Sequence, residues 1–168
     1  VQAEKEGAEY GAENPITVDQ IRESALNGTD VTDRFDDDTI FGRSAKKIAI
    51  ESVGSDLALS AKRKFSDLIS KATLNNADLA DVSSDLKAIT NEYLIIANSV
   101  SPILGRKLYA ELGVNSSAHY NAYSKVYAKK SLDQLQTGTA LNLNMDLKQM
   151  GIELDAVLNF EGNEDQLT

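Results

Sequence analysis

Residues 79–103 read LADVSSDLKAITNEYLIIANSVSPI. Large apolar residues recur here at alternating spacings of three and four, which places them on one side of an α-helix. We call this set the core seam, and it consists of Leu79, Val82, Leu86, Ile89, Tyr93, Ile96, Val100 and Ile103. The spacing predicts one long amphipathic helix around which the rest of the chain packs.

The core seam can either bind another chain or form the interior of a bundle within this one. A free coiled coil usually carries alternating Glu and Lys beside its seam. The flanking positions lack these pairs, and they hold Ser83, Thr90 and Ala97 on one edge and Asp85, Glu92 and Ser99 on the other. Leu94 and Ile95 also widen the apolar face, as in a helix buried among several neighbours. We therefore expect the core of a helical bundle, with oligomer contacts as its extension.

Two further helices are predicted before the core seam. Thr17 and Gln20 have the spacing of a capping box, and Ile16 and Ile21 have the spacing of a hydrophobic staple. Asn27-Gly28 is a helix stop. Together these signals predict a helix over about 18–26. Apolar residues then continue at helical spacing from Thr39 to Leu74, with Gly54-Ser55 as a point where this helix can kink or split.

The connection between this second helix and the core seam has two interpretations. Asn75-Asn76 is a plausible turn, which would make the two helices an antiparallel hairpin. Leu57, Leu68 and Leu79 also recur at equal intervals close to three helical turns, as they would along one uninterrupted helix. Such a helix over 55–101 would be about 70 Å long, too long for a compact domain of this size. We favour the hairpin.

The C-terminal third of the chain is predicted in shorter pieces. Pro102 should end or kink the seam helix, a helix over 103–112 should stop at Gly113, and another should start at 115–117. Apolar and polar residues alternate over 140–148, which predicts a strand or hairpin, although Leu143, Leu147 and later residues also fit a helix. The expected fold is mainly α, a helical bundle of about five helices with a possible small β-hairpin or strand near the C-terminus.

Charge divides the chain into three parts. Residues 1–38 hold eleven acids and three bases, residues 39–130 hold eight acids and thirteen bases, and residues 131–168 hold seven acids and one base. Residues 1–16 have few large apolar groups, so we expect an extended acidic arm that only a partner orders. A helical domain over 17–160 and a flexible tail over 161–168 complete the predicted organisation.

Composition excludes several classes of protein. The chain of 168 residues has the length of a single domain and contains no Cys. The absence of Cys removes disulfide scaffolds, thiolate zinc sites and Cys nucleophiles. No apolar run approaches the roughly 20 residues of a membrane span, so we expect a soluble chain with neither a transmembrane helix nor a signal peptide. The first residue is Val1 rather than Met, which suggests a processed product or an excised segment.

Few residues suggest chemistry. Carboxylates cluster between Asp30 and Asp38, but the calcium-loop pattern fails because Ile40 and Phe41 occupy two of its required positions. Asp38 or Thr39 is better explained as a helix cap. His119 is the single histidine, so a surface or capping role is expected. We predict no catalytic, cofactor-binding or metal-binding residues.

One helical face is a candidate partner-binding surface. It combines aromatic and basic side chains, namely Tyr120, Tyr123, Tyr127, Lys125, Lys129 and Lys130. Aromatic residues interleaved with lysines can bind single-stranded nucleic acid, and Lys62-Arg63-Lys64 is a second basic stretch with this potential. Helical spacing of the tyrosines is explained equally by packing. The sequence pI of about 4.6 also argues against nucleic acid.

These observations favour a non-catalytic structural subunit that assembles with other protein subunits, as a homo- or hetero-oligomer, into a larger particle such as a virion. The alternative is a helical adaptor module that binds a peptide, lipid or nucleic acid. A metal-dependent enzyme that uses the cluster between Asp30 and Asp38 is the least favoured function.

Overall fold

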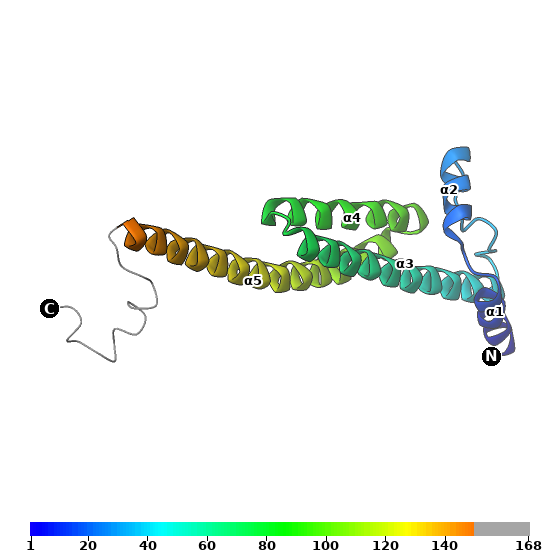
Figure 1. The fold of residues 1–168 in the computed structure, drawn as a ribbon. Coiled ribbons are helices and arrows are strands. Elements are labelled where there is room, and N and C mark those ends of the chain that lie inside the picture. The colour runs from blue at the N-terminus through cyan, green and yellow to red at the C-terminus, as the bar shows by residue number, and fades with distance from the viewer. Residues whose placement is uncertain (150–168) are drawn as a thin grey trace. The chain divides into compact units, whose positions relative to one another are not determined.

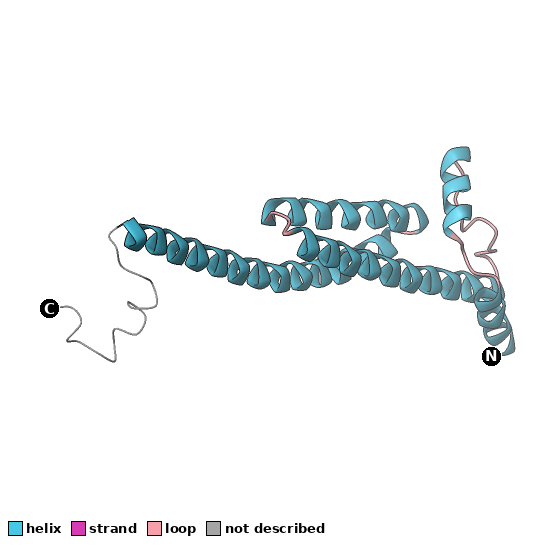
Figure 2. Cartoon of the chain, in the orientation of Figure 1, coloured by secondary structure: helices cyan, strands magenta, loops and turns pink. Residues whose placement is uncertain are grey.

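The computed structural model describes residues 1–149, which form helices and connecting loops without a strand (Figures 1 and 2). The helices are α1 (Gln2–Glu13), α2 (Val18–Asn27), α3 (Ile40–Asn75), α4 (Leu79–Val100) and α5 (Pro102–Gln149). The chain divides into two compact units, Val1–Ser124 and Lys125–Thr168, so the boundary falls within α5. Within residues 1–149, no helix has the length and apolar character required to cross a membrane. The mainly α fold is therefore confirmed.

Helices α3 and α4 form the predicted antiparallel hairpin (Figure 1). Thr39 caps the start of α3, where its hydroxyl accepts a hydrogen bond from the Gly42 amide at 2.9 Å. The helix continues through Gly54 without a split and ends at Asn75, and its C-cap residue Asn76 adopts the left-handed conformation with φ 51°. Asn tolerates this conformation better than most residues, so it turns the chain back into α4. The rival interpretation of a single helix over 55–101 is wrong.

The core of the first unit lies among α3, α4 and the first part of α5. Ser60 of α3 and Tyr93 of α4 hydrogen-bond through their hydroxyls at 2.7 Å, and Lys62 of α3 forms an ion pair with Glu111 of α5 at 2.6 Å. The largest fully buried side chains in this core are Phe65, Leu57, Leu108, Leu112, Val53 and Val82.

The core seam is only partly buried. Val82, Leu86, Tyr93 and Val100 are buried, while Leu79, Ile89 and Ile96 are half-buried. Ile103 lies in α5 beyond Pro102 and is 59% exposed, so its assignment to the seam was wrong. Ile95 is 68% exposed, which contradicts an apolar face buried all round at this end of α4. The seam forms one side of the core of the first unit.

Residues 2–13 form helix α1 on α3, where the sequence predicted an extended arm. Gly7 and Gly11 are buried, and a Cβ atom at either would lie 2.3 Å from a backbone oxygen, of Phe41 and Ala45 respectively. Ser44 also donates a hydrogen bond to the Glu4 carbonyl at 2.6 Å. The prediction failed because it considered only large apolar side chains. Helix α1 instead packs its two glycines directly against the backbone of α3.

The short helix α2 confirms its predicted boundaries and caps. Both hydrogen bonds of the capping box between Thr17 and Gln20 are present, and Gly28 ends the helix with φ 66°. Ile16 and Ile21, the predicted staple, are 2% and 3% exposed. Local sequence signals therefore determined this element.

Helix α5 corrects three predictions. It runs from Pro102 to Gln149 without a break at Gly113, without a new start at 115–117, and without the strand predicted over 140–148. Proline is well suited to the first helical position, and a glycine inside a helix costs only about 1 kcal/mol. Leu, Met and Asp are also poor strand formers. The helix predicted after 148 and the domain boundary at 160 lie outside the described residues.

Candidate partner-binding surfaces

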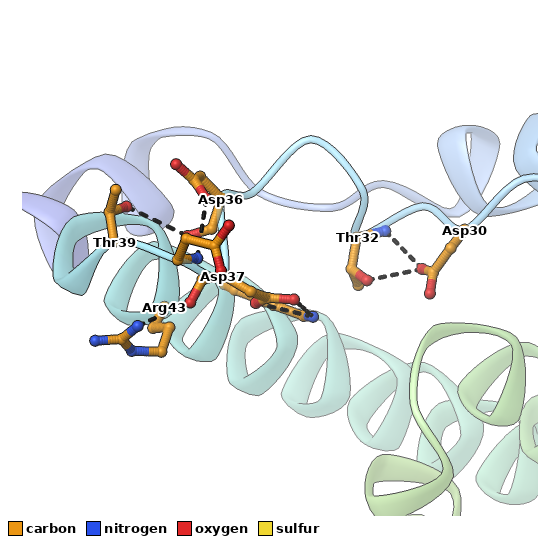
Figure 3. Close-up of polar contacts among 8 residues, drawn as sticks. Asp30, Thr32, Asp36, Asp37, Thr39 and Arg43 are labelled. Carbon is orange, nitrogen blue, oxygen red and sulfur yellow. Dashed lines mark hydrogen bonds and ion pairs between the residues drawn. The ribbon is translucent and has the colours of Figure 1, made fainter.

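The carboxylates between Asp30 and Asp38 do not converge (Figure 3). Asp30 accepts hydrogen bonds from the Thr32 amide and hydroxyl at 2.8 and 2.7 Å, and these two bonds lower the pKa of Asp30. Asp36 accepts from the Asp38 amide at 2.9 Å, and Asp37 forms an ion pair with Lys46 at 3.0 Å. Among residues 1–149, no group of three or more carboxylate or imidazole side chains could hold a metal ion.

This acidic loop instead organises the approach to α3. Arg43 donates a hydrogen bond to the Asp37 carbonyl at 2.8 Å (Figure 3), and Thr39 provides the N-terminal cap predicted from the sequence. Each interaction joins the loop to the first turns of the same helix. These contacts are therefore explained by their role in attaching the loop to the start of α3.

His119 lies inside α5, so it caps no helix end. Its Nδ1 atom is 2.8 Å from the Asn115 carbonyl and its Nε2 atom is 3.4 Å from the Ser66 hydroxyl of α3. Its ring centroid is 5.8 Å from that of Phe65. The histidine thus contributes to the packing of α5 on α3, where the Asn115 side-chain oxygen is buried without a hydrogen-bond partner in the described part of the chain.

The predicted face of tyrosines and lysines is divided between the two units. Tyr123 is 2% exposed in the first unit, and its hydroxyl donates to the carbonyls of Ala77 and, at 3.3 Å, Ala72. Tyr120 is half-buried in the same unit. The remaining members of the set belong to the second unit, namely Tyr127, Lys125, Lys129 and Lys130. Tyr123 is therefore unavailable to a partner.

Replacing Tyr123 with Phe tests this structural role, because the substitution removes the hydroxyl that binds carbonyls at the end of α3. We expect the free energy of unfolding to fall by about 1–2 kcal/mol. Tyr109→Phe is the control, because Tyr109 is 67% exposed. Its free energy of unfolding should change by less than about 0.5 kcal/mol. Urea unfolding followed by circular dichroism measures both, and equal stabilities of the two variants would contradict the role.

The second unit exposes large apolar side chains that the sequence analysis did not recognise as a surface. The described part of this unit is a single helix over 125–149. Its exposed large apolar side chains are Val126 (42%), Leu132 (53%), Leu135 (67%), Leu141 (59%), Leu143 (45%) and Met145 (61%). The alternation over 140–148 predicted a strand there, which hid the helical relation of Leu143 to Leu132 and Leu135. Leu132, Leu135 and Leu143 lie on one side of this helix, whereas Leu141 and Met145 lie on the opposite side. We call the three side chains Leu132, Leu135 and Leu143 the α5 apolar surface.

A groove lies between α3 and α5 within the first unit. It has a volume of about 710 Å³, and its floor includes Gly54, Ala58, Leu104 and Leu108. Leu59 and Ile103 line it although they are 51% and 59% exposed. Its charged lining residues are Lys47, Lys62, Lys107, Glu51 and Glu111. No sequence signal predicted this groove, because it depends on how two distant segments pack.

Comparison of this chain with models of protein families, with curated proteins and with solved structures gave no match.

Proposed function

We propose that this chain is a non-catalytic structural subunit that self-associates into a larger particle, and that the α5 apolar surface is one of its contacts. The single observation that carries the proposal is the exposure of Leu132, Leu135 and Leu143 on one side of the helix over 125–149, each between 45% and 67%. Clustered exposed apolar residues mark surfaces that a partner covers. Helical stability in proteins comes mostly from the packing of an apolar face, so a partner that covers this surface would stabilise the helix over 125–149.

The contacts of the basic residues favour assembly over nucleic-acid binding. In the Lys62-Arg63-Lys64 sequence, Lys62 pairs with Glu111 and Lys64 pairs with Glu92 at 3.1 Å. The hydrogen bond from Lys64 to Glu92 raises the pKa of Lys64. Tyr123 is buried, so it offers no stacking platform for a base. Both predicted nucleic-acid surfaces thus have part of their binding groups engaged within the chain.

The native mass of the full chain tests the proposal. Sedimentation velocity over a range of concentrations should give species heavier than the 18.2 kDa chain. Leu135→Asp places a charge in the α5 apolar surface, and we expect it to weaken association at least about tenfold. Leu74→Asp is the matched control because Leu74 is 85% exposed in the first unit. A wild-type chain that remains at 18.2 kDa at every concentration would overturn the proposal.

A further inference from the structure

We propose that the groove between α3 and α5 binds residues 150–161 of a second copy of this chain. This inference rests on the proposed self-association and names a second contact within it. A contact of this kind joins two different surfaces, so repeated copies build a ring or a filament. Such growth suits a particle made of many subunits.

The lining of the groove favours an occupant with an apolar face. Leu104 and Leu108 form part of the floor and are 7% and 2% exposed, while Leu59 and Ile103 remain more than half exposed. A Cβ atom at Gly54 would lie 2.5 Å from the Leu104 side chain, so α5 approaches α3 closely at the base of the groove. The groove therefore exists before an occupant binds. An occupant would cover its apolar atoms without moving α3 and α5 apart.

The charges of the groove favour an acidic occupant. Lys47 and Lys107 form no ion pair with any described residue, whereas Lys62 is already paired with Glu111. Glu51 also lines the groove without an ion pair to a described residue, so two unpaired lysines face one unpaired carboxylate. The excess positive charge favours carboxylates from outside the unit, and complementary charges of this kind set specificity between partners.

Residues 150–161 match both requirements in sequence. They contain Glu153, Asp155 and Glu161 and no basic residue. The helix over 125–149 is a poorer match, because it contains four lysines and two aspartates. Met150, Leu154 and Val157 are spaced by four and three, the pattern of an amphipathic helix. Charge and apolar spacing together distinguish this segment from the rest of the C-terminal region.

The lengths also agree. The α3 side of the groove extends from Lys47 to Lys62. That interval corresponds to about 22 Å of α-helix, and residues 150–161 would span about 18 Å as a helix. The segment could therefore lie along the groove with its carboxylates near Lys47 and Lys107.

Charge exchange between two variants of the full chain tests the contact. The groove variant carries Lys47→Glu and Lys107→Glu, and the tail variant carries Glu153→Lys and Asp155→Lys. Each alone should weaken self-association at least about tenfold, because like charges then face each other. An equimolar mixture should recover the wild-type affinity, since each altered surface finds its complement. Arg63→Glu with Lys71→Glu is the control, because both residues are exposed and lie outside the groove.

Two outcomes of this experiment overturn the inference. The first is a groove variant that associates with wild-type affinity, and the second is a mixture that fails to recover. Leu135→Asp separates this inference from the proposed function. If either outcome is observed and Leu135→Asp still abolishes association, the proposed function stands and only the groove contact fails.

Cross-linking gives an independent test of the same contact. The chain has no native Cys, so Leu59→Cys and Val157→Cys allow cross-linking between defined positions with a bifunctional bis-maleimide. A mixture of these two variants should give cross-linked dimers. A doubly substituted chain that cross-links only within itself would overturn the inference, because it would place the segment in its own groove.

Discussion

Gly11→Ala is expected to undock α1, whereas Gly113→Ala is expected to stabilise the chain, although both add the same methyl group. At Gly11 the new carbon would lie 2.3 Å from the Ala45 carbonyl oxygen, a backbone atom that cannot rotate away. Helix α1 must therefore move off α3. At Gly113, apart from its two chain neighbours and the adjacent backbone of α5 itself, no atom lies within 4 Å of the new carbon. The higher helix propensity of Ala should therefore add about 1 kcal/mol to the free energy of unfolding.

Hydrogen exchange distinguishes the two variants. An isolated helix shorter than about 12–15 residues is marginal in water, so the amides of an undocked α1 should exchange at least about tenfold faster than in the wild type. The amides of α4 should keep their protection, because α4 packs on a different part of α3. If α1 is equally protected in Gly11→Ala and the wild type, the close backbone contact does not hold the helix in place. Gly113→Ala should leave α1 unchanged and raise the urea midpoint.

The elements predicted correctly are those determined by neighbouring residues. Thr17 and Gln20 need only each other to form a capping box, and Asn76 turns the chain through its own backbone conformation. The hairpin of α3 and α4 follows from that turn and from the apolar spacing on both sides. Local signals of this kind are present in the sequence whether or not the rest of the fold is known.

The elements predicted wrongly depend on contacts between distant residues. Gly7 and Gly11 look like helix-weakening residues until the backbone of α3 is placed beside them. Gly113 resembles a helix stop, yet α5 continues through it. Helical spacing placed Tyr123 and Tyr127 on one face but could not show that Tyr123 is buried or that the two belong to different units. The groove likewise requires the packing of α3 and α5.

Leu112→Ala is expected to reduce the free energy of unfolding by about 2–5 kcal/mol, the range for a large buried aliphatic side chain replaced by Ala. Leu112 is 0% exposed on α5, and no solvent can fill the space it leaves without wetting apolar neighbours. Leu74→Ala is the matched control, because Leu74 is 85% exposed. The same substitution there should change the free energy of unfolding by less than about 0.5 kcal/mol.

Urea unfolding followed by circular dichroism measures both losses, and Leu112→Met provides a further comparison. Methionine nearly preserves the volume, so its cost should stay below about 1.5 kcal/mol. A loss for Leu112→Ala as small as that for Leu74→Ala would mean that this part of α5 is not packed in the core. Leu104 and Leu108 precede Leu112 at intervals of four on the same helix, and both form part of the groove floor. The stability of the Leu112 variants therefore tests whether this part of α5 packs firmly on the first unit. The proposed contact between copies requires that packing, because the same part of α5 forms the groove floor.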